Sequence, residues 1–303
     1  MHPAWSIIFF TCVSGLGLGL AACLVIGLIH LTSIHQIVVV ACLTFALIGS
    51  GLMSSTLHLG HPERAWRALT QWRSSWLSRE GVLAILVLGC LSFWFLHCYL
   101  IGPTPVWFNF FLLMLVVATV YATSMIYASL RTVFCWYSHL TPVCYLAFSA
   151  SGGMLLALFL INMFEQETIY LHWICALVLC ASWACKFFWW RRLDNGGSKS
   201  NLATATGLGS FGEVRSLMHP HTSENYLQKE MGFKIARRHA MKLRLIAVTF
   251  GALIPIFFSI ALPYQLFACF IAVISHIFGM FIERWLFFAE AKHVVSLYYG
   301  EVH

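Results

Sequence analysis

Eight long apolar runs limit the folds open to this chain more than any other feature of its sequence. An α-helix needs about 20 apolar residues to cross a bilayer, and each run is close to that length. The runs cover about 5–29, 37–57, 82–101, 106–128, 143–164, 169–190, 245–263 and 266–288. In lipid only helices and closed barrels satisfy every backbone hydrogen-bonding group, and these runs lack the alternation of barrel strands. The sequence therefore predicts an all-α, polytopic membrane protein of eight transmembrane helices, packed as two four-helix bundles in one domain over residues 1–303.

Composition supports a membrane protein and argues against other classes. The chain is 60% hydrophobic and 10% charged, whereas soluble globular proteins have about 25% charged residues. The eleven cysteines include no Cys-x-x-Cys spacing, so we expect apolar packing residues and no metal site. The first apolar run follows no positively charged segment and has no small-residue cleavage site, which predicts a retained span rather than a signal peptide.

The distribution of basic residues predicts the orientation. With eight spans, both termini and the connections near 58–81, 129–142 and 191–244 share one side of the membrane. All 18 Lys and Arg residues belong to that side or to helix ends facing it, while one connection on the other side carries Glu165 and Glu167. The positive-inside rule then places both termini in the cytoplasm of a bacterium, with the chain in the inner membrane. The net charge of +7 reflects this asymmetry, so we expect no nucleic-acid partner.

The polar hairpin at 58–81, between the second and third runs, is the first candidate for a site. Together with the three residues before it, it holds four arginines, two histidines, two glutamates and three tryptophans. Pro62 suits the first turn of a short helix. Tryptophans on one side of that helix and arginines on another predict that it lies at the membrane interface.

His58 and Glu80 flank this hairpin at the ends of neighbouring spans, so we expect them at one depth. An imidazole and a carboxyl group at the edge of the hydrocarbon can exchange protons with a lipid-soluble molecule. A quinone fits, because its head takes two electrons and two protons. We predict that His58 bonds a quinone oxygen, that Glu80 relays protons, and that Arg64 holds Glu80 ionised or orients the head. No catalytic residue for a soluble substrate is predicted.

A purely structural explanation exists for each of these residues. Glu80 can complement a helix N-terminus capped by Ser78, and His58 can bond free carbonyls at a helix end. The cytoplasmic connection at 191–241 also has two interpretations. It begins with a turn-rich linker and ends in a basic helical segment, which can contact membrane lipid headgroups or dock a cytoplasmic subunit.

The hairpin resembles a known family. Leu57-His58-Leu59-Gly60, Pro62, Arg64-Ala65, Leu77-Ser78 and Glu80 are similar to the membrane anchor subunits of dimethyl sulfoxide reductase and its relatives. The eight-span plan and the segment from Glu283 to Gly300 fit the same family. The resemblance implies an anchor that tethers a molybdopterin catalytic subunit and an iron–sulfur subunit and exchanges electrons with quinone. The family's quinol-binding histidine and glutamate fall on His58 and Glu80, and its hairpin arginine on Arg64.

The predicted orientation favours one branch of that family. In the dimethyl sulfoxide reductase branch the hairpin faces the periplasm, whereas the charge distribution here places it in the cytoplasm. This is similar to the cytoplasmic membrane-bound sulfite dehydrogenases, which oxidise sulfite and reduce quinone. We therefore expect both partner subunits on the cytoplasmic face, and ubiquinone or menaquinone as the electron carrier.

Three alternatives stay open. The protein can be the quinol-oxidising anchor of a dimethyl sulfoxide reductase-type complex. It can instead hold a b-type haem, which needs axial ligands such as histidine, and the candidates are His276 in the eighth span and His30, His97 and His172 near the opposite face. It can also be a transporter, since Pro255 and Pro263 interrupt the seventh run. Against a transporter, we expect His276 to be the one acid or base in mid-span.

Overall fold

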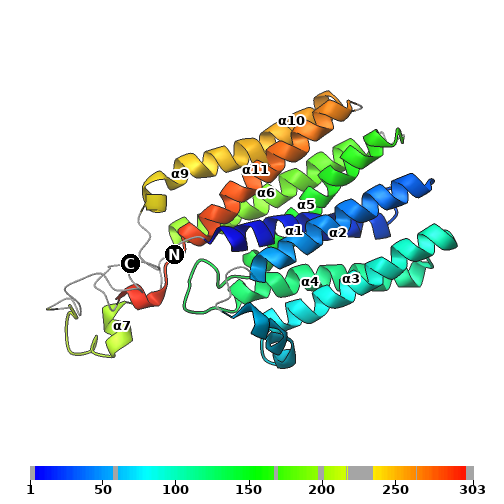
Figure 1. Cartoon of the computed structure of the whole chain (residues 1–303). Helices are drawn as coiled ribbons and strands as arrows, with labels where there is room; N and C mark the ends of the chain where they lie inside the picture. Colours follow the sequence, from blue (N-terminus) through cyan, green and yellow to red (C-terminus); the bar gives the residue numbers. More distant parts are fainter. Residues whose placement is uncertain are drawn as a thin grey trace.

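Across the residues that the structure describes, eight helices are long and apolar enough to cross a membrane, which confirms the predicted all-α fold. The structure is a computed structural model, and it describes residues 4–56, 61–166, 170–196, 201–215, 217, 235–263 and 265–297. The spans are α1 (Trp5–Val25), α2 (Ile34–Thr56), α3 (Trp76–Leu100), α4 (Val106–Ala128), α5 (Leu140–Met163), α6 (Leu171–Asn195), a composite helix at His239–Ala261, and α11 (Leu266–Ala289). They lie side by side as one array (Figure 1).

Shorter elements connect the spans. They are η1 (Pro62–Gln71), α7 (Leu202–Thr206) and η3 (Val294–Leu297). The composite seventh span is built from α9 (Ile235–Val248), η2 (Thr249–Leu253) and α10 (Ile254–Ala261), and η2 is a π-helical turn. Pro255 has no amide hydrogen for the carbonyl of Gly251, four residues before it. The π-helical turn η2 therefore lies where Pro255 removes one hydrogen bond of the regular α-helix.

Two helices extend further into polar sequence than their apolar runs predict. α3 begins at Trp76 instead of 82, because the Ser75 side chain caps it by accepting a hydrogen bond from the Ser78 amide at 3.4 Å. α6 continues to Asn195 instead of ending at 190, and Gly196 follows it. Both extensions bring charged residues inside a helix, which matters for the site.

α1 lies at the centre of the packing and contacts α2, α4, α5 and α11. Its closest approach is to α5, where an added Cβ on Gly19 would collide with the Ser149 carbonyl oxygen, and one on Gly153 would collide with the Gly19 carbonyl carbon. Ser149 Oγ also donates to the Gly15 carbonyl at 2.7 Å. Small residues allow this close contact between helices in lipid. The division into two four-helix bundles stays a prediction, and α1 with α5 would form the joint between them.

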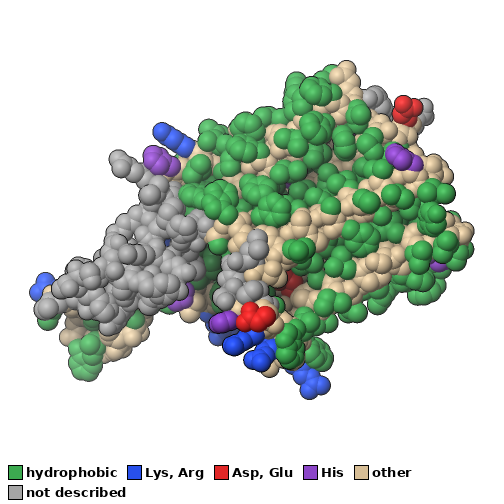
Figure 2. Space-filling model, in the orientation of Figure 1, with side chains coloured by type: hydrophobic (Ala, Val, Ile, Leu, Met, Phe, Trp, Pro, Cys, Tyr) green, Lys and Arg blue, Asp and Glu red, His purple; other side chains and the backbone are tan. Residues whose placement is uncertain are grey.

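The outer surface suits a lipid environment. Figure 2 shows hydrophobic side chains over the flanks of the helices, with lysine and arginine side chains in view mainly near the hairpin end. Large apolar residues on α3, α4 and α6 are exposed in the isolated chain, among them Phe93, Phe110 and Leu177. On a soluble protein, apolar patches of this extent would mark a contact surface. Here they form the faces that lipid covers.

Candidate functional site

The polar hairpin folds as a short 3₁₀ helix, η1, followed by the start of α3. Pro62 occupies its first turn, as the sequence predicts, and Ser78 Oγ donates to the Ala68 carbonyl, which ties η1 to α3. Each tryptophan of the hairpin lies against a neighbouring arginine. The guanidinium-to-ring distances are 5.7 Å for Arg67 and Trp66, 5.4 Å for Arg73 and Trp72, and 4.3 Å for Arg79 and Trp76. The hairpin thus presents paired aromatic and cationic groups at the end of the helix array.

Glu80 points into the helix array rather than toward solvent. It lies in the second turn of α3 and is 4% exposed. The Thr123 hydroxyl of α4 donates to Glu80 Oε1. The cap of α3 is Ser75 and not Ser78, so the expected structural explanation, with Ser78 as cap, does not describe this helix start. A carboxyl group that is buried at the hairpin end and bonded to a neighbouring span remains a strong candidate for proton exchange.

The other two predicted site residues are placed differently. Arg64 is exposed, and its Nε lies 3.7 Å from Oε1 of the adjacent Glu63. Glu63 Oε1 is also 3.0 Å from His61 Nδ1. Within the described residues the structure therefore pairs Arg64 with Glu63, and Glu80 with Thr123. His58 lies outside the described residues.

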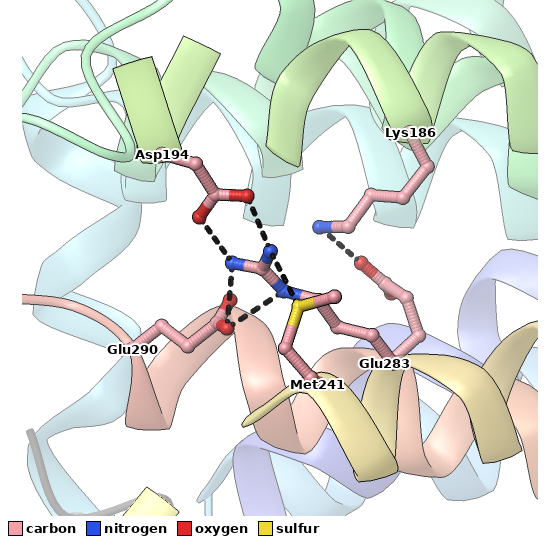
Figure 3. A network of polar contacts seen from close by, with 6 residues as sticks. Lys186, Asp194, Met241, Glu283 and Glu290 are labelled. Carbon is pink, nitrogen blue, oxygen red and sulfur yellow. Dashed lines mark hydrogen bonds and ion pairs between the residues drawn. The ribbon is translucent and has the colours of Figure 1, made fainter. Parts of the chain in front are cut away.

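A buried group of charges, which sequence analysis missed, joins α6 to α11 (Figure 3). Lys186 Nζ lies 2.6 Å from Glu283 Oε1, and Arg284 Nε lies 3.0 Å from Glu283 Oε2. The expectation that His276 is the one acid or base in mid-span is therefore wrong. Lys186 carries no clear signal because the apolar and aromatic residues around it in the sixth run outweigh its charge, and Glu283 and Arg284 stand out in the sequence only as part of a family segment.

Aromatic rings surround these buried cations. Lys186 Nζ lies 3.6 Å from the centre of the Trp189 ring, and the Arg284 guanidinium lies 3.9 Å from the centre of the Tyr145 ring. Aromatic faces attract cations most strongly where water is excluded. The tryptophan-rich end of α6 thus helps to hold a lysine inside a membrane protein.

A second ionic group lies next to the first, nearer the end of the helices (Figure 3). The Arg244 guanidinium on α9 is 2.6 Å from Asp194 Oδ2 and 2.9 Å from Glu290 Oε1. Burial raises the pKa of Glu290, and the charges of Arg244 and Lys186 only partly offset that rise. The two groups together hold three cations and three anions, so they are balanced without Glu80.

Two small cavities lie between these features. One, of about 10 Å³, is lined by Glu80, Thr123, Ser14 and Leu18 among others. The other, of about 30 Å³, shares Thr123, Ser14 and Leu18 and reaches His276 and Arg284. Polar groups from α1, α3, α4, α5 and α11 line these two cavities.

Two of the histidines considered as haem ligands bond backbone carbonyls. His276 Nδ1 is 2.7 Å from the Gly251 oxygen, and His97 Nδ1 is 2.9 Å from the Gly102 oxygen. The haem alternative stays a hypothesis, since these contacts leave the second ring nitrogen of each histidine available.

Comparison with known proteins gives two kinds of match. The family model described as DMSO reductase anchor subunit matches residues 1–300. A sulfite dehydrogenase subunit of Allochromatium vinosum is 30% identical over 327 aligned residues, which cover 100% of each protein. A subunit of the anaerobic dimethyl sulfoxide reductase of Escherichia coli is 30% identical over 168 residues, covering 52% of the present sequence and 58% of that protein. No solved structure matches the sequence.

Proposed function

The chain belongs to the family of DMSO reductase anchor subunits, the membrane subunits of molybdoenzyme complexes, and on that premise we propose that it is the quinone-reactive subunit of such a complex. Its partners are an iron–sulfur subunit and a molybdopterin catalytic subunit, and the chemistry of the soluble substrate belongs to the catalytic subunit. Electrons pass between the iron–sulfur subunit and a quinone held near the hairpin.

The observation that carries the proposal is the placement of Glu80. A buried carboxylate in a membrane span is energetically expensive, so such residues usually serve a function. Glu80 lies in the second turn of α3, at the end of the array where the arginine-rich hairpin lies. Its bond to Thr123 fixes the orientation of the carboxyl group.

These residues suit a quinone head. A quinone supplies two-electron chemistry that consumes or releases two protons. Glu80 would hold or give one of these protons at its carboxyl oxygen, and His58 would hydrogen-bond one quinone oxygen. Arg64 contacts Glu63 and must change partner to take part. That change costs little, because the pair at 3.7 Å is exposed and therefore weak.

Sulfite is the proposed electron source. The relative that aligns over its whole length with this protein is named a sulfite dehydrogenase subunit, whereas the dimethyl sulfoxide reductase relative aligns over about half of each sequence. The basic residues favour a cytoplasmic hairpin, and partner subunits on that face, because all 18 lie on one side or in helix ends facing it. Electrons would then flow from sulfite in the cytoplasm to quinone in the inner membrane.

The test is Glu80→Gln in the intact complex. The substitution keeps the shape of the side chain and a hydrogen bond to Thr123 but removes the exchangeable carboxyl proton. We expect the three subunits to copurify as before, and sulfite-to-quinone turnover to fall by about 10²-fold or more, the usual contribution of a general acid–base group.

Glu63→Gln is the matched control, because it removes the exposed acid of the same hairpin. It should leave turnover unchanged. Equal turnover in Glu80→Gln and wild-type membranes would contradict the proposed function.

A further inference from the structure

The two cavities, one lined by Glu80 and the other by His276, have volumes that suit water. A buried water needs about 10–15 Å³ of cavity volume. The cavity next to Glu80, of about 10 Å³, therefore suits one water, and the deeper cavity, of about 30 Å³, suits two or three. The volume of each cavity therefore matches a small number of waters.

Thr123 lines both cavities. Its hydroxyl donates to Glu80 Oε1 and also lies 3.0 Å from the Thr119 carbonyl oxygen. A hydroxyl has one hydrogen to donate and two lone pairs to accept with. When it donates to Thr119 it can accept from a protonated Glu80, and when Glu80 is ionised it can donate to the carboxylate. Thr123 can therefore stay bonded to Glu80 in both protonation states.

His276 lines the deeper cavity and has one ring nitrogen fixed. Because Pro255 cannot donate to the Gly251 carbonyl, that oxygen accepts hydrogen bonds from Trp183 Nε1 at 3.0 Å and from His276 Nδ1 at 2.7 Å. A carbonyl can only accept, so Nδ1 carries the hydrogen and Nε2 has a free lone pair. His276 is 1% exposed, and within the described residues its Nε2 has no hydrogen-bond partner.

The deeper cavity is lined by His276 and Leu16. An added Cβ on Gly152 would lie 3.4 Å from His276 Nε2 and 2.5 Å from Leu16 Cδ2, so it would contact both of these lining residues. Ser14 and Ser149 line the same cavity and supply hydroxyl groups, although each hydroxyl hydrogen already bonds a backbone carbonyl. Their lone pairs remain able to accept hydrogen bonds from water.

Charged and titratable groups face these cavities from each helix packed around them. Arg284 lines the deeper cavity, and Glu283, shared with Lys186, balances its charge. The titratable groups of the surrounding helices are Cys12 on α1, Glu80 on α3, Tyr127 on α4, Tyr145 on α5, Lys186 on α6, and His276, Glu283 and Arg284 on α11. Arg284 stays charged, and Glu283 is shared between Lys186 and Arg284. A protonated His276 would lie in the same cavity as the Arg284 cation without an anion of its own, so His276 stays neutral and Glu80 is the group suited to exchange a proton.

We propose that water in these two cavities forms a hydrogen-bonded chain from His276 Nε2 to the Thr123 hydroxyl beside Glu80, so that neutral His276 is a positioning residue for water at the quinone site. The inference rests on the proposed function. Glu80 gives its proton to a quinone oxygen, and the Thr123 hydroxyl then donates to the carboxylate while water donates to the Thr123 oxygen; Glu80 regains a proton from solvent at the hairpin face before the next transfer. His276 keeps its one proton on Nδ1 and accepts a hydrogen bond from water at Nε2, and the electrons stay between the quinone and the iron–sulfur partner.

The test uses Thr123→Val in the purified complex, with Thr44→Val as the matched control. Both changes delete one buried hydroxyl with little change in shape, but the Thr44 hydroxyl donates within its own helix, to the Val40 oxygen at 2.8 Å. We expect Thr123→Val to slow quinone turnover at least about tenfold and to raise the ratio of rates in H₂O and D₂O. Binding of a quinone-analogue inhibitor should change less than about twofold, and Thr44→Val should resemble wild type.

A second variant reaches the other end of the path. Gly152→Ala puts a methyl group near His276 Nε2 and 2.5 Å from Cδ2 of Leu16, a flexible side chain that can move. Gly152→Ala should slow quinone turnover and raise the ratio of rates in H₂O and D₂O as Thr123→Val does. If Thr123→Val and Gly152→Ala both match wild type in rate and isotope effect while Glu80→Gln is slow, the water path is wrong and the proposed function stands. If Glu80→Gln is also normal, the proposed function fails first.

Direct observation of water gives a readout that does not depend on activity. A high-resolution cryo-EM map of the assembled complex should show ordered water between Thr123 and His276. A map in which side chains close either cavity would overturn the inference.

Discussion

Two ion pairs in this molecule differ in almost every respect that decides their energy. Arg64 and Glu63 of the hairpin lie 3.7 Å apart with 58% and 62% of their side chains exposed. Lys186 and Glu283 lie 2.6 Å apart with 1% and 0% exposed. An exposed pair contributes about 0–1 kcal/mol, whereas removing one partner of a buried pair costs about 3–5 kcal/mol.

The difference separates the residues that are conspicuous in the sequence from those on which the fold depends. The hairpin charges stand out because polar residues surround them. The buried charges are hidden within apolar helices, yet they connect α6, α9 and α11. We therefore expect substitutions of the exposed hairpin charges to have little effect on stability, and substitutions in the buried groups to change stability first.

The largest effect is expected for Glu283→Gln. The change leaves Lys186 and Arg284 as two buried cations without their shared anion. We expect a loss of at least about 3–5 kcal/mol of stability, seen as a lower unfolding temperature and poor recovery of the subunit in detergent. An unfolding temperature equal to that of wild type would show that the buried group is not a main support of the fold.

A smaller effect is expected for Lys186→Met, because Glu283 keeps Arg284 as its partner. Adding Lys186→Met to Glu283→Gln should restore part of the stability that Glu283→Gln loses, since it removes one of the two unpaired cations. Thermal unfolding of the two single variants and the double variant measures this coupling. Simple addition of the two single losses would contradict a direct Lys186–Glu283 interaction.

Glu290 gives a prediction about pH. Burial raises its folded-state pKa above the usual value of 4.5, so the folded protein binds the proton more tightly than the unfolded chain. Its contribution to stability is then greatest below pH 4.5 and falls as the pH rises through 4.5 and the raised folded-state pKa. Glu290→Gln cannot titrate at this position. The unfolding temperature of wild type minus that of Glu290→Gln should therefore fall as the pH rises from about 4 to 8. A difference that instead grows with pH would show that the Arg244 pair outweighs burial.

The smallest effect on stability is expected for Arg64→Ala. Its pair with Glu63 is exposed and separated by 3.7 Å, so the free energy of unfolding should change by less than about 1 kcal/mol. Chemical denaturation in low and high salt checks this. A loss comparable to that of Lys186→Met would mean that the hairpin charges support the fold after all.

Much of the fold could be predicted from hydropathy, because each span is a long apolar run that lipid requires to be helical. Helix ends were less predictable. The Trp76–Glu80 segment contains Ser78, Arg79 and Glu80, so hydropathy assigns it to the connection, although Ser75 caps α3 before it.

Lys186 gives no signal in the hydropathy pattern either. Its charge is outweighed by the surrounding aromatic residues, and its pairing with Glu283 depends on how α6 packs against α11, which a pattern along one helix does not contain.

The candidate site was predictable only in part. Glu80 stands out in the sequence because it lies at a span edge, and the structure gives it a buried position with Thr123 as partner. The Thr123 hydroxyl and the cavity leading to His276 had no signal of their own. Threonine is common in membrane helices, so Thr123 does not stand out. The hydrogen bond from His276 to the Gly251 carbonyl can be explained only once the packing brings His276 next to that carbonyl, to which Pro255 cannot donate.

The most direct test of the account is a cryo-EM map of the assembled complex with a bound quinone analogue. The account predicts a head-group oxygen within hydrogen-bonding distance of the Glu80 carboxyl group, about 2.5–3.0 Å, with the iron–sulfur partner on the hairpin face. An analogue bound at the opposite face of the membrane, or a partner docked there, would contradict it.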